Sequence, residues 1–265
     1  AFRYWQPPKM LLVIVIQDVM MNKQLRYIVP NLFTISSLFA GLAALHFTAQ
    51  TEFVRAAWFV TLSIVLDGLD GKTARLLCAT SKFGAEADSF ADFVAFGVVP
   101  GFLAWQICLK NFGLLGMSVF AFYVLCGGFR LVRFNLGNKN PNVKSDFQGL
   151  PIPAGAAVIA SFILFTHKVF ATFNGDVLFL FVTIFTSFLM VSHVPYVAVN
   201  KSPHCNRSRN IMISVVLVAL ALSVKYFSYV YIVSIWAYIF SGFMHLISQL
   251  IHMKMNKRNE IERYQ

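Results

Sequence analysis

Charged residues are scarce in this chain of 265 residues, and acidic ones are scarcest. Asp, Glu, Lys and Arg together make up 12% of the sequence, about half of the ~25% that is usual in soluble domains. Hydrophobic residues make up 58%, and apolar runs recur along the whole length. These runs approach the roughly 20 residues that a helix needs to cross a bilayer. The composition excludes a soluble globular protein and predicts an all-α integral membrane protein.

Cysteine is rare as well. The four cysteines form no C-x-x-C pair and show no spacing typical of metal ligands. We therefore expect neither a disulfide framework nor a zinc site. The six histidines are scattered, and none forms a ligand-like pair.

The hydropathy pattern predicts eight membrane-spanning helices. They are expected at about 31–49, 56–75, 85–109, 113–134, 151–167, 176–196, 211–227 and 229–250. The net charge of +11 could suggest a nucleic-acid partner. Of the 22 lysines and arginines, however, 18 fall on one predicted side of the membrane, and the other side holds only Arg55, Lys110, Lys168 and Lys225. This asymmetry predicts that both termini are cytoplasmic. An anionic leaflet explains the positive charge without nucleic acid.

Five of the 11 acidic residues lie between positions 67 and 92. A carboxylate at the centre of a membrane helix costs roughly 2.5–3.5 kcal/mol even on lenient insertion scales. The spacing places two sets of residues on one helix face each. The first set is Asp67, Asp70, Gly71, Ala74 and Arg75, and the second is Gly84, Asp88 and Asp92. Eight intervening residues let the chain turn and bring the two faces together.

Four carboxylates on facing helices are suited to Mg²⁺ or Mn²⁺, which take oxygen ligands and often share phosphate oxygens. Two such ions can clamp a diphosphate during an in-line displacement, and a carboxylate at the edge can act as general base. Small residues allow close approach of a ligand, and Arg75 suits phosphate. Buried ion pairs or helix caps are an alternative, as is a cation-coupled transporter. Lys72, Arg75 and Lys82 are too few to pair all four charges.

The pattern D-x2-D-G-x2-A-R-x8-G-x3-D-x3-D, from Asp67 to Asp92, resembles the signature of the CDP-alcohol phosphatidyltransferases at every fixed position. The resemblance implies a six-helix core, a homodimer, and transfer of a phosphatidyl group from a CDP-linked lipid to an alcohol with release of CMP. It also implies two metal ions held by Asp67, Asp70, Asp88 and Asp92, with Asp92 as the base. Gly71, Ala74, Arg75 and Gly84 would border the cytidine diphosphate.

Four flanking segments resemble bacterial and archaeal phosphatidylserine synthases. They are the segments 26–34, 88–100, 129–135 and 147–154, and together they favour L-serine as the acceptor. Glycerol 3-phosphate and inositol are the alternative alcohols. Arg130 and Arg133 suit the serine carboxylate or a phosphate, although anchoring on the cytoplasmic side explains them about as well. Asn135 is a further acceptor candidate or a helix cap. Asn31 and Thr34 are candidates for nucleotide contact or for helix-start chemistry.

The resemblance thus implies a transfer of the phosphatidyl group from CDP-diacylglycerol to L-serine, and the charge asymmetry places the expected active site at the cytoplasmic face of the cytoplasmic membrane. We expect an N-terminal cytoplasmic or interfacial segment over 1–25 and the transmembrane core over 26–200. Two additional transmembrane helices over 201–253 and a charged tail over 254–265 complete the predicted organisation.

Overall fold

A computed structural model describes residues 23–77, 82–138, 147–170, 176–196, 227–244 and 246–248. Within these ranges the chain is helical apart from two very short strands. The elements are α2 (Lys23–Ala49), α3 (Phe53–Leu76), α4 (Lys82–Asp92), the π-helix η1 (Phe93–Val98), α5 (Val99–Ile107), the 3₁₀ helix η2 (Leu109–Phe112), α6 (Leu114–Asn138), β1 (Phe147–Gln148), α7 (Ile152–Phe170), α8 (Asp176–Val191) and β2 (Pro195–Tyr196). A further helix covers 227–244 and 246–248.

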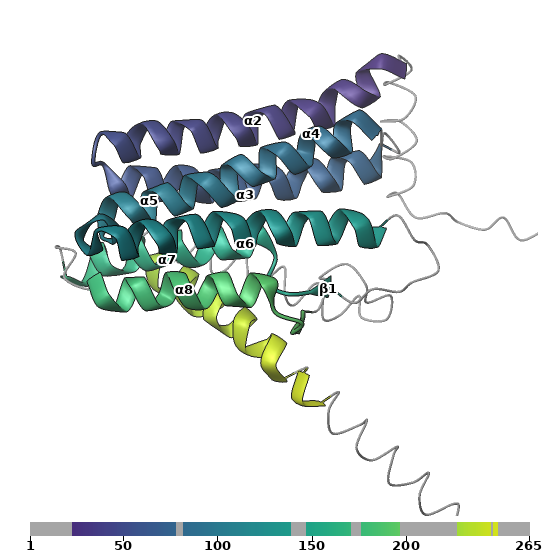
Figure 1. Cartoon of the computed structure of the whole chain (residues 1–265). Coiled ribbons are helices and arrows are strands. Elements are labelled where there is room, and N and C mark those ends of the chain that lie inside the picture. The colour runs from purple at the N-terminus through teal and green to yellow at the C-terminus, as the bar shows by residue number, and fades with distance from the viewer. Residues whose placement is uncertain are drawn as a thin grey trace, which may run out of the picture.

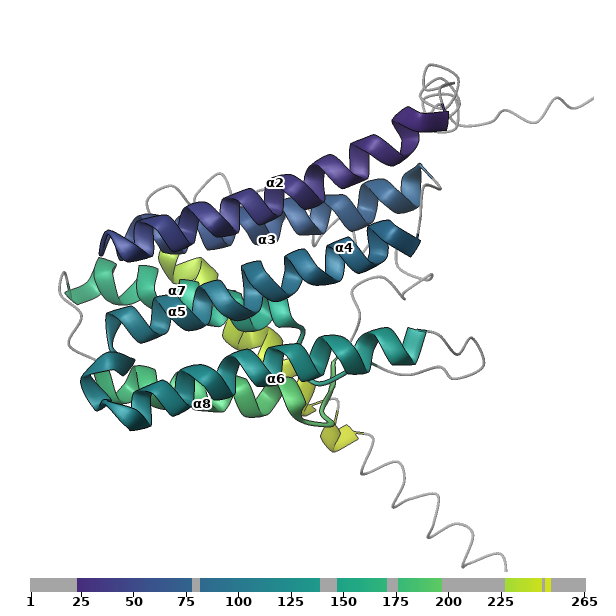
Figure 2. The same ribbon diagram turned by 45° about the horizontal axis from the view of Figure 1, so that its top comes forward.

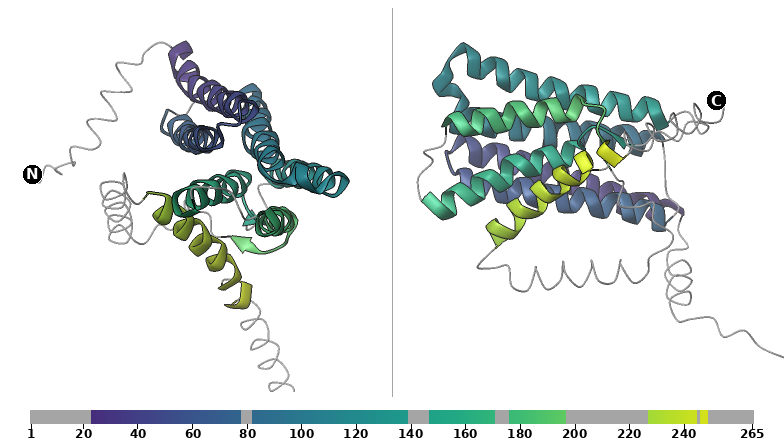
Figure 3. Two further views of the ribbon diagram at one scale, coloured as in Figure 1. Left: turned by 90° about the vertical axis from the view of Figure 1, so that its left-hand side faces the viewer. Right: turned by 90° about the horizontal axis from the view of Figure 1, so that it is seen from below.

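Helices α2 to α8 run alongside one another as a bundle (Figure 1). Helices α4, η1 and α5 follow one another as a single long rod, so the bundle has six rods in the described part of the chain. Helix 227–248, drawn in yellow, crosses the bundle obliquely (Figure 2). The end-on view in Figure 3 shows it beside α7 and α8, outside the six rods.

Five of the described helices are long and apolar enough to cross a membrane. They cover Val29–Ala49, Gly84–Ile107, Leu114–Leu136, Ile152–Val169 and Phe227–Ser248. Helix α3 carries the charged end of the aspartate pattern and is not one of them, and α8 is a shorter apolar helix. The prediction of an all-α membrane protein is confirmed. Predicted segments within 1–22, 201–226 and 249–265 lie outside the described residues, including nearly all of the predicted span 211–227.

Polar side chains join α2 to α3 inside the bundle. Ser37 and Ser63 each direct a hydroxyl at the other's backbone carbonyl, at 3.0 and 2.8 Å, and their hydroxyls lie 2.9 Å apart. Both residues are buried, so water cannot replace these hydrogen bonds. A side chain at Gly41 would stand 3.0 Å from the Cβ of Ala95, which indicates close packing of α2 against the third rod. The site-bearing helices are therefore firmly held.

The third rod changes its winding directly after Asp92. Residues 93–98 form a π-helix, and Pro100 follows in the first turn of α5. Proline has no backbone N–H to donate to a carbonyl one turn earlier. The buried Tyr123 of α6 instead donates its hydroxyl to the carbonyl of Phe96, at 3.3 Å. The π-turn thereby sets the rotation of Asp88 and Asp92 relative to α5, and such turns are frequent at functional sites.

Candidate active site

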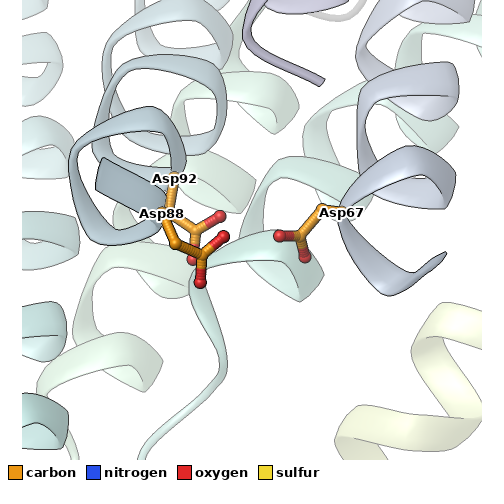
Figure 4. Close-up of side chains that lie close together, drawn as sticks. All are labelled: Asp67, Asp88 and Asp92. Atoms are coloured by element: carbon orange, nitrogen blue, oxygen red, sulfur yellow. The ribbon is translucent and has the colours of Figure 1, made fainter. Parts of the chain in front are cut away.

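Three aspartates from two helices meet at one end of the bundle. Asp67 projects from α3, and Asp88 and Asp92 project from α4 toward it (Figure 4). Each offers a carboxylate oxygen, and these oxygens all lie within 4.8 Å of one another. The carboxyl groups of Asp67 and Asp92 are within hydrogen-bonding range. The i, i+4 spacing in α4 places Asp88 and Asp92 one turn apart on the same face, so the structure brings together the two faces expected from the sequence.

Asp70 lies at the edge of this cluster. Its carboxylate accepts a hydrogen bond from the Thr34 hydroxyl of α2, and its carboxyl group also interacts with Asp88. Thr34 and Asp70 are both buried, at 9% and 6% exposure. Thr34, a candidate for nucleotide contact or helix-start chemistry, therefore contacts one of the four aspartates directly. The sequence indicated only that Thr34 is a polar residue at the start of an apolar helix. Its partner Asp70 lies 36 residues later, so the sequence did not indicate the contact itself.

The charges of the cluster are only partly balanced by protein. Arg130 of α6 is 8% exposed and interacts electrostatically with Asp92. Among the described side chains, the ion pair closer than 4 Å joins Arg55 to Glu52, away from the aspartates. Three ionised carboxylates this close repel one another, and a divalent cation between them removes that repulsion. The donor set, all carboxylate oxygen, fits Mg²⁺ or Mn²⁺.

The remaining predicted nucleotide residues surround the same end of α2, α3 and α4. Gly71 is exposed, whereas Ala74 and Gly84 are half-buried. Asn31 is half-buried on α2, one turn before Thr34. The backbone of Arg75 belongs to α3, but its side chain lies outside the described part of the structure. Gly71 and Gly84 carry no side chain, and glycine permits close approach of a ligand to the backbone.

Arg133 has a structural contact that the sequence did not predict. Its guanidinium donates to the carbonyls of Val191 and Ser192 at 3.1 Å each and of Met190 at 3.4 Å. These are the free carbonyls at the C-terminal end of α8, where a cation is favourable. Gly149, at φ +83°, lies against the same guanidinium, and a Cβ there would stand 2.6 Å from Nη2. Arg133 thus joins α6, α8 and the segment before α7.

Asn135 joins α6 to α4. Its amide donates to the Ser89 hydroxyl at 3.0 Å, so in this structure it is not a cap of α6. Beside this contact a cavity of about 500 Å³ lies between the two helices, with mostly apolar walls. Its lining includes Glu86, Ser89, Phe90, Phe93, Val124, Leu125, Gly128, Phe129, Leu131, Val132 and Asn135. The polar members of this lining include Ser89, the residue after Asp88.

The sequence matches the family model of the CDP-alcohol phosphatidyltransferases over residues 27–192, which is more than half of the chain. The chain belongs to this family. The match includes all four aspartates and ends just after α8, so helix 227–248 lies outside it. The family is known to use divalent metal, and the acidic cluster could bind such an ion.

Three relatives illustrate the similarity within the CDP-alcohol phosphatidyltransferase family, and each is named CDP-diacylglycerol–serine O-phosphatidyltransferase. The Helicobacter pylori protein is 44% identical over 171 residues, covering 64% of this chain and 72% of its own. The Bacillus subtilis protein is 37% identical over 171 residues, covering 63% and 89%. The Methanocaldococcus jannaschii protein is 45% identical over 103 residues, covering 39% and 47%.

Proposed function

We propose that this membrane protein transfers the phosphatidyl group of CDP-diacylglycerol to L-serine, giving phosphatidylserine and CMP. The observation that carries the proposal is the meeting of Asp67, Asp88 and Asp92 in a chain of the CDP-alcohol phosphatidyltransferase family. Serine is the acceptor because the curated relatives are named for it. The flanking segments point to the same alcohol.

The aspartates form the metal-binding part of the proposed site. Asp67, Asp88 and Asp92 would hold the Mg²⁺ or Mn²⁺, and Asp70 would complete the ligand set for the second expected ion. Thr34 fixes the Asp70 carboxylate through its hydroxyl. When bound, the divalent ions neutralise the diphosphate and stabilise charge on the attacked phosphorus and on the leaving group.

Asp92 is the proposed general base. It would accept the proton of the serine hydroxyl, and the serine oxygen would form a new bond to the β-phosphorus of the CDP-lipid. The bond between that phosphorus and the oxygen of CMP breaks in the same displacement, and CMP leaves. Asp92 suits this role because it is the last residue of α4, directly before the π-turn, and interacts with Arg130.

Two groups of residues would bind the lipid nucleotide. Gly71, Ala74, Arg75 and Gly84, with Asn31, would border the cytidine diphosphate at the ends of α2, α3 and α4. The cavity between α4 and α6 would take an acyl chain, because its walls are mostly apolar and its polar rim includes Ser89 beside Asp88. The chain would enter this cavity sideways from the bilayer.

Arg130 is the proposed acceptor contact. It is buried, carries a guanidinium suited to a carboxylate, and interacts with Asp92, where the serine hydroxyl must react. Its Cζ also lies 5.2 Å from the centre of the Phe134 ring, which restricts its orientation. Arg133 and Asn135 would support this subsite from their contacts with α8 and α4.

Membrane sidedness and assembly are further parts of the proposal. The predicted distribution of lysine and arginine would place the aspartate end of the bundle at the cytoplasmic face, with both termini on that side. A homodimer is expected from the family resemblance. Glycosylation-site or cysteine-labelling scans of the loops would test the sidedness, and crosslinking in native membranes would test the dimer.

The activity is tested with purified protein, CDP-diacylglycerol, Mn²⁺ and a panel of alcohols, measuring CMP release. We expect CMP with serine and little with glycerol 3-phosphate or inositol. CMP with another alcohol but not with serine would overturn the acceptor. No CMP with any alcohol, together with ion flux in proteoliposomes, would replace the enzyme with a cation transporter.

A further inference from the structure

The third rod and α6 lie close together along part of their length and separate toward α4 and the C-terminal end of α6 (Figure 1 and Figure 2). A Cβ at Gly128 of α6 would stand 3.2 Å from the ring of Phe93, so the two rods are in contact there. The cavity of about 500 Å³ lies between the same two rods, and its lining extends to Ser89 and Asn135. The cavity occupies space where side chains would otherwise pack. A direct contact between α4 and α6 at this end therefore matters for their spacing.

Asn135 provides such a contact. Its amide donates to the Ser89 hydroxyl at 3.0 Å, although the two residues are 46 positions apart. The Ser89 hydroxyl donates its single proton to the carbonyl of Ala85, one turn earlier in α4, also at 3.0 Å. This second hydrogen bond fixes the position of the hydroxyl relative to the backbone of α4. The two hydrogen bonds together link the Asn135 side chain to the α4 backbone.

Ser89 directly follows Asp88, so this link acts on the turn of α4 that carries the carboxylates. Successive residues of a helix point about 100° apart. Asp88 points toward Asp67 of α3 (Figure 4), whereas Ser89 faces α6. The carboxylates of α3 and α4 repel one another when ionised, and this repulsion favours rotation of Asp88 away from Asp67. The hydrogen bond from Asn135 opposes that rotation from the α6 side of the helix.

We propose that Asn135 is a positioning residue of the metal site, holding the Ser89 hydroxyl and with it the turn of α4 that places Asp88 opposite Asp67. This inference rests on the proposed function, because it takes the aspartates as the metal ligands. Asn135 is not itself a ligand and acts on the ligands through Ser89. It thus supports the acceptor subsite by keeping α4 in place and not by binding serine.

The test measures Mn²⁺ binding by purified Ser89→Ala and Asn135→Leu proteins in detergent, without substrate. The rise of the melting temperature with Mn²⁺ concentration gives the Kd. Loss of a neutral hydrogen bond changes an equilibrium about three- to tenfold, so each variant should raise the Kd for Mn²⁺ by about that factor. Ser89→Thr keeps the hydroxyl and should bind Mn²⁺ within about twofold of the unmodified protein.

Ser118→Ala is the matched control for loss of a serine hydroxyl. Ser118 of α6 makes the same kind of hydrogen bond to the carbonyl four residues earlier, that of Leu114, at 2.9 Å. This variant should bind Mn²⁺ like the unmodified protein. A Kd for Mn²⁺ in Ser89→Ala equal to that of Ser118→Ala would overturn the inference. So would a lower melting temperature of metal-free Ser89→Ala at an unchanged Kd, which indicates a purely structural role.

A double-mutant cycle tests whether Asn135 acts through Ser89. The variant with both Ser89→Ala and Asn135→Leu should bind Mn²⁺ within about twofold of either single variant, because residues that act through one contact are not additive. Losses that multiply in the double variant would mean that the two residues act separately, and would overturn the inference. Ser89→Ala removes only one oxygen atom, so its Kd decides the matter even if Asn135→Leu does not fold.

CMP release separates positioning from direct contact with the acceptor. At saturating Mn²⁺ we expect the KM for serine in Asn135→Leu to stay within about twofold of that of the unmodified protein. A raised KM for serine at an unchanged Kd for Mn²⁺ would identify Asn135 as an acceptor contact and overturn this inference alone. A melting temperature of the unmodified protein that does not respond to Mn²⁺ would overturn the proposed metal site and this inference together. CMP release with another alcohol but not with serine would overturn only the proposed acceptor, because the Kd for Mn²⁺ is measured without substrate.

Discussion

Removal of the Thr34 hydroxyl should weaken the response of the enzyme to metal. Thr34 donates to the Asp70 carboxylate, and both residues are almost completely buried. Water therefore cannot replace the hydrogen bond in Thr34→Val, and a hydrogen bond to a charged group contributes about 1.5–3 kcal/mol. We expect this energy to orient Asp70 for metal binding. Since about 1.4 kcal/mol corresponds to a tenfold change in affinity, its loss should weaken metal binding roughly 10- to 100-fold. Residues that orient metal ligands have losses of the same size when mutated, about 10–100-fold.

The measurement is the Mn²⁺ concentration that gives half-maximal CMP release. Thr34→Ser keeps the hydroxyl and should retain most of the affinity. Thr48→Val is the matched control, because Thr48 is also buried on α2 but donates to the carbonyl of Ala44 in its own helix, at 2.7 Å. A Thr34→Val protein with the Mn²⁺ dependence of Thr48→Val would refute the reasoning. A raised KM for CDP-diacylglycerol at unchanged Mn²⁺ dependence would instead support direct nucleotide contact by Thr34.

Three further outcomes follow from the site and its supports. Arg133→Ala should lower the free energy of unfolding in detergent by about 1–3 kcal/mol, because the carbonyls at the end of α8 lose their donor; an unchanged melting temperature would contradict this. Gly149→Ala should lower the free energy of unfolding by about 1–2 kcal/mol from the positive φ alone, and by more because the new Cβ would meet Arg133. Gly113 also has a positive φ but open space around it, so Gly113→Ala measures the backbone effect by itself. Chelation of divalent ions should stop CMP release, and Mn²⁺ at 100 times its Kd should restore it and stabilise the protein by about 2.7 kcal/mol. Asp67→Asn should lose most of that stabilisation. A melting temperature of the unmodified protein that does not change when Mn²⁺ is added would contradict the metal site.

The sequence predicted the features that depend on local periodicity. Apolar runs located the helices, and the i, i+4 spacing of Asp88 and Asp92 placed them on one face. The eight-residue gap predicted that this face meets Asp67, as it does. These inferences succeeded because a helix fixes the direction of each side chain from its position in the turn.

Contacts between distant segments could not be predicted in the same way. Arg133 was predicted as an acceptor contact or as an anchor on the cytoplasmic side, and its guanidinium donates to carbonyls 57 to 59 residues later in the chain. Backbone carbonyls carry no sequence signature, so no pattern could reveal these partners. The π-turn after Asp92 was not expected either. Pro100 was a local signal for it, but the hydroxyl that donates to the carbonyl of Phe96 belongs to Tyr123, which lies on another helix.

Helix 227–248 illustrates the same limit. Its apolar pattern predicted a membrane-spanning helix, and the structure has a helix there that is long and apolar enough to cross a membrane. How the helix crosses α7 and α8 depends on aromatic contacts such as Trp236 on Phe185, which the apolar pattern does not indicate. Such packing is a property of the assembled bundle.

The central claim is that the aspartate cluster transfers a phosphatidyl group to serine, with Asp92 as the base. The most direct measurement follows CMP and phosphatidylserine together, in the unmodified protein and in Asp92→Asn, with CDP-diacylglycerol, serine and Mn²⁺. The account predicts equal amounts of the two products from the unmodified protein. It predicts none from Asp92→Asn, although that variant still binds the CDP-lipid. Products from Asp92→Asn at the rate of the unmodified protein would contradict the claim.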